Sequence, residues 1–149
     1  MEIPSTILDT LAKLQLQGQF LTLNKALNEF PSGYFKDLLT QVTERGCTLF
    51  APTDAAFRKL PKIYRTFPMD EKTKLELYRI LRYHIVPRAV RSKRLGRSAK
   101  LNTLLGKQLQ INNPKGPGFF VNQKSRVVES DVRCSNGVIH AVNTVLIPN

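Results

Sequence analysis

The chain has 149 residues, of which 42% are hydrophobic and 23% charged, a balance typical of an ordinary globular protein with one core. No run approaches the roughly 20 apolar residues that span a bilayer. The N-terminus does not show the pattern of a secretory leader, as expected either for an intracellular chain or for one whose leader has been removed. Lys and Arg outnumber Asp and Glu by 23 to 11, and residues 58–149 hold the whole excess, with nineteen basic and five acidic side chains. This asymmetry favours a polyanionic partner or serves solubility.

The first part of the chain has the apolar spacing of α-helices. Stripes over residues 7–14 and 20–30 repeat every three or four positions, and a shorter helix is expected over residues 34–42. A further helix begins at Asp70, where acidic residues in the first turn complement the helix dipole. Its buried side is predicted to comprise Leu75, Leu77, Tyr78 and Leu81.

Residues 48–57 read as a buried strand that turns directly into a helix. Pro52 ends the strand because it has no N–H to donate to a sheet. Thr53 can cap the helix by accepting a hydrogen bond from its first turn. Phe50 and Phe57, on either side of this corner, are expected to point into the core.

The second half of the chain reads as strands. Residues 104–111 and a segment from Phe119 have strand character, separated by a turn signal at residues 112–118, and residues 138–145 alternate with period two. Asn136 and Gly137 predict a tight hairpin, because both residue types tolerate positive φ. Helices followed by strands indicate an α+β fold rather than a parallel βαβ sheet, in a single domain over residues 1–149.

Three segments carry a family resemblance: residues 48–57, residues 83–87 with Tyr83-His84, and residues 136–148 with Asn-Gly-Val-Ile-His. In this order and spacing they resemble the signature of the fasciclin-like domain, an extracellular recognition module. The resemblance implies a β-wedge of two small sheets with helices packed along one side, and a secreted or cell-surface location. The residues that form its structural motif are Thr48, Phe50, Pro52, Thr53, Phe57, Asn136, Gly137 and His140.

Enzyme signatures are missing from the sequence. There is no GxSxG, HExxH, Walker or GxGxxG motif, and neither His84 nor His140 has a Cys, Asp or Glu at metal-ligand spacing. We therefore expect no catalytic residues, no metal and no cofactor. For both histidines, a buried structural role is favoured over direct recognition.

A receptor-binding element is implied by the resemblance at Glu129, Asp131 and Val132, supported by the corner of Tyr83 and His84. The Asp131 carboxylate is suited to completing the shell of a divalent cation held by an integrin-like receptor. The alternative is an aspartate that hydrogen-bonds its own turn.

A basic run free of acids predicts a polyanion-binding strip. If it formed a short helix, its spacing of three would gather the arginines on one face. Sulfated glycosaminoglycan, an acidic cell-wall polymer or an anionic membrane surface would fit it, whereas nucleic acid is disfavoured because no aromatic residues are interleaved. The strip comprises Arg88, Arg91, Lys93, Arg94, Arg97 and Lys100.

Several alternatives remain open from the sequence. Cys47 and Cys134 either pair in a disulfide, if their strands are neighbours, or are two buried thiols. The favoured function is a non-enzymatic adhesion or recognition module. Algal family members that bind carotenoids suggest a carrier of a carotenoid or other apolar small molecule instead, in a groove flanked by the first helices. The third possibility is a structural domain of a larger protein.

Overall fold

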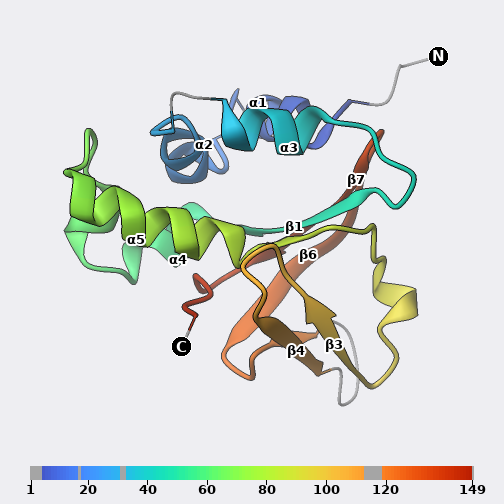
Figure 1. The fold of residues 1–149 in the computed structure, drawn as a ribbon. Helices are drawn as coiled ribbons and strands as arrows, with labels where there is room; N and C mark the ends of the chain where they lie inside the picture. Colours follow the sequence, from blue (N-terminus) through green and yellow to red (C-terminus); the bar gives the residue numbers. More distant parts are fainter. Residues whose placement is uncertain (1–4, 17, 31–32, 113–118, 149) are drawn as a thin grey trace.

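The computed structural model describes residues 5–16, 18–30, 33–112 and 119–148, and shows an α+β fold (Figure 1). Its α-helices are α1 (Ile7–Leu16), α2 (Leu21–Leu27), α3 (Tyr34–Thr40), α4 (Asp54–Arg58) and α5 (Glu71–Arg82), with 3₁₀ turns η1 (Lys62–Arg65) and η2 (Ser92–Arg94). Its strands are β1 (Cys47–Pro52), β2 (Ile85–Val86), β3 (Ser98–Asn102), β4 (Gln108–Asn112), β5 (Phe120–Val121), β6 (Ser125–Cys134) and β7 (Gly137–Val142). Among these described helices, none is both long and apolar enough to cross a membrane.

The strands follow the order β2-β1-β7-β6-β5-β4-β3. The two halves of this sheet share β6, which pairs with β7 on one side and with β5 on the other. Neighbouring strands are antiparallel except for β1 and β7, which run parallel with Thr48 opposite Val138 and Pro52 opposite Val142. The two most recognisable segments of the sequence therefore lie side by side.

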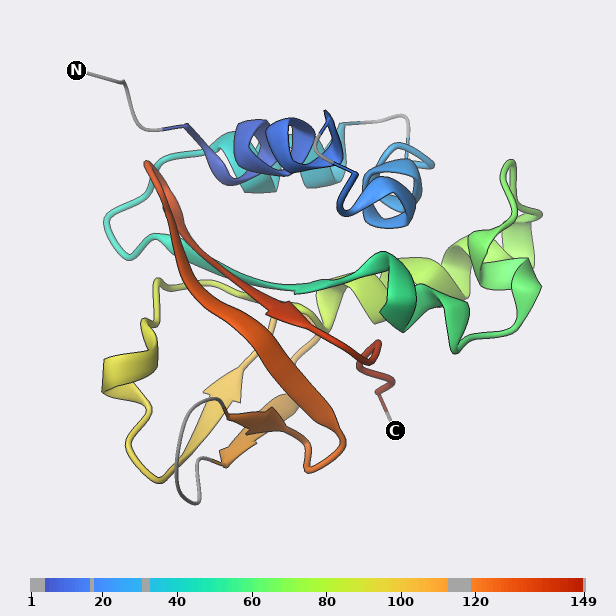
Figure 2. The same ribbon diagram turned by 180° about the vertical axis from the view of Figure 1, so that it is seen from behind.

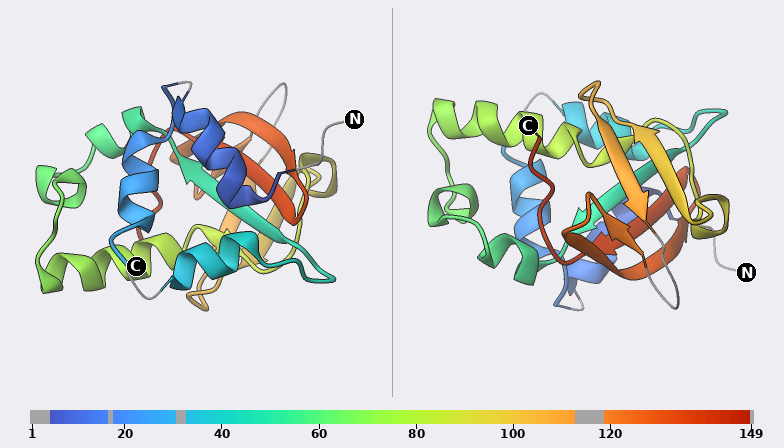
Figure 3. Two further views of the ribbon diagram at one scale, coloured as in Figure 1. Left: turned by 90° about the horizontal axis from the view of Figure 1, so that it is seen from above. Right: turned by 90° about the horizontal axis from the view of Figure 1, so that it is seen from below.

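β1 and β7 are buried on both faces, because helices cover one side and the strands β3–β5 cover the other (Figures 1 and 2). Leu49 and Ile139 face the helical side, where they share a core with Leu11 of α1 and Leu77 of α5. Phe50 and Val142, which face the other side, belong to a second core with the apolar residues of β3, β4 and β5. Views from above and below show helices α1–α3 (blue to cyan) and the β3–β4 hairpin on opposite sides of these strands (Figure 3). The α+β prediction is confirmed.

The predicted corner after β1 is also confirmed. Thr53 caps α4, since its Oγ1 accepts a hydrogen bond from Ala56 N at 3.1 Å, and its own N–H donates to Val142 O at 3.1 Å. Phe50 and Phe57 are both fully buried, but in different cores: Phe50 of β1 packs with the apolar residues of β3–β5, whereas Phe57 of α4 packs with those of the helices.

Some boundaries differ from the sequence prediction. α3 ends at Thr40 rather than at residue 42, and Leu75 is 68% exposed, because α5 buries Leu77, Ile80 and Leu81 instead. β3 was not predicted, since its alternate residues are polar and only Leu101 is fully buried. The turn signal at residues 113–118 lies outside the described residues.

The β6–β7 hairpin forms where it was predicted, but for a different reason. Neither Asn136 nor Gly137 has positive φ. Asn136 is buried and its amide joins distant segments: Oδ1 accepts from Ile7 N at 2.9 Å, while Nδ2 donates to Leu39 O at 2.9 Å. Gly137 is required by close packing, because a Cβ there would lie 1.9 Å from Cys47 O.

Of the two alternatives for the cysteines, the disulfide does not form: Cys47 and Cys134 are free thiols. Gly137 pairs with Cys47 on one side and with Cys134 on the other, so β7 separates the two cysteines. Two strand spacings place their Cα atoms roughly 9–10 Å apart, beyond the distance that a disulfide spans. Burial, together with the neighbouring Cys134, raises the pKa of the Cys47 thiol to about 11, so it is unreactive near neutral pH.

Candidate functional site

The basic segment, residues 88–100, runs from β2 through η2 into β3 along the edge of the molecule far from α4 and α5 (Figure 1, yellow). All six of its predicted cationic side chains are exposed. None of them forms an ion pair with another residue in the described ranges, where the ion pairs all involve Lys74. Their charges are therefore available to a partner from outside.

A short helix along this segment, which would have gathered its arginines on one face, does not form. η2 covers only Ser92–Arg94, Arg91 has extended backbone (φ −80°, ψ 157°), and Lys100 lies in β3 opposite Gln110. The cations are therefore spread along a loop and a strand edge rather than gathered on one helical face. An elongated ligand suits this arrangement better than a compact one.

Thr48 fixes the start of the basic segment. It is completely buried in β1, and its Oγ1 donates to Arg88 O at 2.7 Å while accepting from Val90 N at 2.8 Å. On the other side, Ala89 N donates to Arg45 O at 2.7 Å. The backbone that carries Arg88 and Arg91 is thus held on both sides.

Asp131 fixes the middle of the segment. It lies at an irregularity of β6 with φ +59°, and its carboxylate accepts hydrogen bonds from Ser92 N at 2.8 Å and from Ser92 Oγ. Burial alone would raise the pKa of Asp131, but the Ser92 hydrogen bonds and the charge of Arg133 contribute to lowering it by more, so the carboxylate is ionised and occupied.

The hydrogen bonds of Asp131 affect how the predicted receptor-binding element can meet a partner. Both carboxylate oxygens of Asp131 bind Ser92, so neither is presented freely to a receptor's cation. Glu129 is exposed and Val132 is half-buried. Asp131 therefore anchors the basic segment in this structure, while the receptor-binding role of the element stays a prediction.

His140 completes the anchor from the interior. Its Nδ1 accepts from Asp131 N at 3.1 Å, so the proton lies on Nε2, which donates to Val90 O at 2.8 Å. Burial lowers the pKa of His140, which keeps the ring neutral and able to accept.

Tyr83 and His84 lie inside the protein, with exposed fractions of 6% and 1%, so neither can contact a receptor directly. His84 Nε2 accepts from Leu146 N at 2.9 Å, and its protonated Nδ1 donates to Ile80 O at 2.7 Å. Burial lowers the pKa of His84 to about 4. Because both histidines use both ring nitrogens, neither has one free for proton transfer. Across the described residues, no three His, Cys, Asp or Glu side chains gather as metal ligands.

The fold adds two arginines that the sequence prediction missed. Arg45, before β1, and Arg133, in β6, are exposed and line a hollow of about 250 Å³ together with Arg91. Ser135 also lines it, and Glu44 is the single acid among its lining residues. No spacing in the sequence relates these three arginines, since β1, β6 and the basic segment meet only through the sheet. We call the six cations of the basic segment, Arg45 and Arg133 the basic surface.

The predicted groove for an apolar ligand is not supported. The hollow beside the first helices and β7, lined by Gln19, Phe20 and Ala141, measures about 280 Å³. This lies just below the range of about 300–1,000 Å³ typical of ligand pockets. The apolar stripes of α1 and α2 pack into the main core instead.

Comparison with known proteins matches residues 18–148 to the Fasciclin domain. The chain is 38% identical over 106 residues to the transforming growth factor-beta-induced protein ig-h3 of Sus scrofa, covering 68% of this chain and 14% of that protein. It is 34% identical over 113 residues to protein sll1483 of Synechocystis, covering 75% of this chain and 61% of that protein. The chain thus spans less than two thirds of either relative.

The fold also matches a solved structure, a FAS1 domain pair from the insect cell adhesion molecule fasciclin I. The TM-score is 0.63 with 18% sequence identity, and the match covers 82% of this chain and 43% of that one. At this identity the match concerns the fold alone. It agrees with the mixed helix and sheet arrangement described above.

Proposed function

Since this chain belongs to the fasciclin domain family, we propose that it is a non-enzymatic recognition domain that acts outside the cell and binds an acidic polysaccharide through the basic surface. One observation carries the proposal. Thr48, Asp131 and His140, three side chains buried or half-buried in the sheet, all hold the backbone of the basic segment, while its cations remain exposed.

A polymer fits this surface better than a small anion. The cations extend from the hollow at Arg45 and Arg133, past η2, to Lys100 in β3, and guanidinium groups bind sulfate and carboxylate with two parallel hydrogen bonds. Repeated charges on a chain molecule can engage several of these groups together, so that weak contacts add up.

The proposal is tested with the variant Arg91→Ser/Arg94→Ser/Arg97→Ser on immobilised heparin, a sulfated polysaccharide, and polygalacturonate, a carboxylated one. Wild-type protein should be retained and released by salt, since exposed charge contacts are screened. The variant should elute at markedly lower salt.

The matched control is Arg58→Ser/Lys62→Ser/Lys72→Ser, which removes three exposed cations at α4, η1 and α5, far from the basic segment (Figure 1). It has the same formal charge as the test variant, and it should elute like the wild type. Equal losses in both variants would show that net charge alone causes retention, and would overturn the proposal. Retention on vesicles of anionic lipid, with none on either polysaccharide, would also contradict it.

A further inference from the structure

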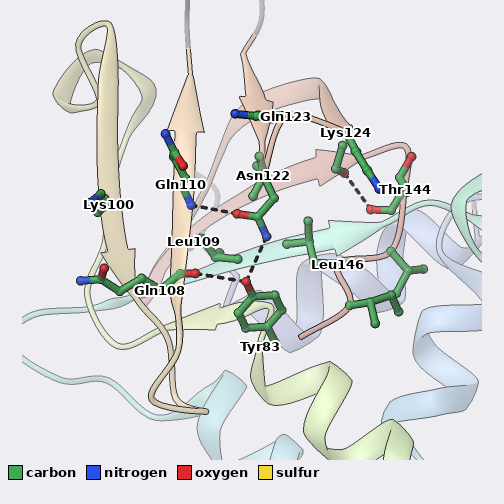
Figure 4. Close-up of a pocket in the computed structure, with 14 residues that line it drawn as sticks. Tyr83, Lys100, Gln108, Leu109, Gln110, Asn122, Gln123, Lys124, Thr144 and Leu146 are labelled. Atoms are coloured by element: carbon green, nitrogen blue, oxygen red, sulfur yellow. Dashed lines mark hydrogen bonds between the residues drawn. The ribbon is translucent and has the colours of Figure 1, made fainter. Parts of the chain in front are cut away.

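A third hollow, of about 650 Å³, lies where β4, the β5–β6 turn and the segment after β7 meet. Tyr83 lies at its base, Gln110 and Lys100 on one side, and Lys124 on the other (Figure 4). Its volume is well within the range of small-molecule sites. No predicted role covers this hollow, although Tyr83 and Lys100 were singled out for other reasons.

Hydrogen bonds fix the walls of the hollow. Asn122 Oδ1 accepts from Gln110 N at 2.9 Å, and Asn122 Nδ2 donates to Tyr83 Oη at 3.0 Å. Tyr83 Oη in turn donates to Gln108 O at 3.1 Å (Figure 4). Asn122 and Gln123 both have positive φ, at 53° and 67°, so the turn keeps a conformation that costs energy for residues with a Cβ. The hollow is therefore formed in advance of any ligand.

Four polar side chains on the walls have no hydrogen-bond or ion-pair partner within the described part of the chain: Lys100, Gln110, Gln123 and Lys124. Each is exposed. Their heads offer two amides, which donate and accept, and two ammonium groups, which only donate. The residues lining the hollow include no Asp or Glu, so its charge is positive.

The floor of the hollow is apolar, with Val121, Val145 and Leu146 buried beneath it and Ile147 exposed at its margin. A ligand with hydroxyl groups on its edges, a carboxylate or sulfate, and an apolar ring face matches amides, ammonium groups and this floor together. We propose that the hollow binds one acidic sugar residue, a uronic acid or a sulfated sugar.

Lys100 belongs to both the basic surface and this hollow. A polysaccharide lying along the basic surface can therefore place one of its sugars in the hollow, and in this respect the inference rests on the proposed function. The basic surface would supply general attraction to acidic polymers. The hollow would supply preference for the sugar, because hydrogen bonds to fixed groups discriminate where surface charges do not.

The test titrates ¹⁵N-labelled protein with a trimer of galacturonic acid, a short acidic oligosaccharide, and with the neutral trimer maltotriose. The acidic trimer should shift the amide resonances of Gln110, Asn122, Gln123 and Ser125. In the variant Gln123→Ala/Lys124→Ala its dissociation constant should rise about tenfold, as expected when a charge-assisted contact is lost. The matched control Gln19→Ala/Lys25→Ala, which changes exposed side chains near α2, should bind like the wild type.

The two proposals can fail separately. One outcome is that the acidic trimer causes no shifts at the hollow while retention of the polymer still depends on Arg91, Arg94 and Arg97. This result would overturn the proposed sugar site in the hollow and leave the proposed function of the basic surface standing. Shifts of the same size with maltotriose would overturn the assignment of an acidic sugar. Shifts confined to the hollow, with polymer retention unaffected by the arginine variant, would support the hollow and overturn the proposed function.

Discussion

The interior around the two histidines and the basic segment next to it use their polar groups in opposite ways. In the interior, each ring nitrogen of His84 and His140 has one backbone partner. Along the basic segment, the backbone is held by side chains such as Thr48 and Asp131, while the cations form no ion pair within the described residues. Buried polar groups that all have partners are typical of structural roles. Exposed cations without an ion-pair partner leave their charge available to an anionic ligand.

The most recognisable residues of this chain therefore act indirectly. Asp131 attracts attention in the sequence as a recognition residue, yet its carboxylate binds Ser92. His140 accepts from Asp131 N and donates to Val90 O, so it also supports the basic segment from within. Four changes test this division of roles, and they should differ in size.

The largest loss of stability is expected for Gly137→Ala, which disrupts the packing of β1 against β7 in the interior. Its new Cβ would lie 1.9 Å from Cys47 O, so β1 and β7 would have to separate. The free energy of unfolding, measured by urea denaturation, should fall by about 3 kcal/mol or more. The control Gly96→Ala also changes a glycine, at φ +59° with open space around the Cβ, and should lose only about 1–2 kcal/mol. Equal losses would mean that the close β1–β7 packing is not the cause.

Acidification should have the next largest effect, because it lowers the stability of the interior around His84. An unfolded chain protonates His84 near pH 6.5, whereas the buried ring in the folded state protonates only at about pH 4. Between these values the unfolded state binds more protons than the folded state. The contribution of neutral His84 to the free energy of unfolding is therefore complete above pH 6.5 and is lost as the pH falls to 4. The loss should amount to about 3 kcal/mol. His140, whose pKa is also lowered, acts in the same direction.

The measurement is the free energy of unfolding by urea at a series of pH values for the wild type and for His84→Gln. The variant should be less stable at pH 7 and should depend less on pH, because the titrating ring is gone. An unchanged slope would show that other groups cause the acid sensitivity.

Asp131→Ala tests the contact between the two regions. The change leaves Ser92 N without its acceptor, and an unsatisfied donor costs about 1–3 kcal/mol. The amide hydrogen of Ser92 should also exchange with solvent faster, which NMR can follow. Ser92→Ala removes only the hydroxyl and keeps the N–H donor, so it should have the smaller effect. If Asp131→Ala leaves amide exchange at Ser92 unchanged, Asp131 does not anchor the segment.

The smallest effect on stability is expected for Arg91→Ser/Arg94→Ser/Arg97→Ser. These side chains are exposed and have no ion-pair partner among the described residues, so the free energy of unfolding should change by no more than about 0.5 kcal/mol. Thermal denaturation beside the heparin measurement checks this. A large loss of stability would place the arginines with the interior and contradict the comparison.

Local features of this fold could be predicted from the sequence, because neighbouring residues determine them. Pro52 ends a strand through its missing N–H, and the Thr53 cap requires only the next three residues. The α+β order followed in the same way from the change of periodicity. The close approach at Gly137 was not predictable, since it depends on Cys47, ninety residues earlier (137 − 47).

The candidate site was predictable only in part. The cations of residues 88–100 are visible as a charge run without acids. The addition of Arg45 and Arg133, the bond between Asp131 and Ser92, and the separation of the two cysteines all depend on which strands become neighbours. The hollow at Tyr83 had no signal in the sequence, because its walls come from five separate segments of the chain.

The parallel pairing of β1 with β7 has a consequence for synthesis in the cell. Thr48 meets Val138, so ninety residues (138 − 48) must be translated after β1 before its main partner exists. At a rate of about 5–20 residues per second, this strand waits on the order of 5–20 seconds with both apolar faces incompletely covered. The nascent protein should therefore depend on chaperones during that interval, and on release of its final hairpin from the ribosome for folding to finish.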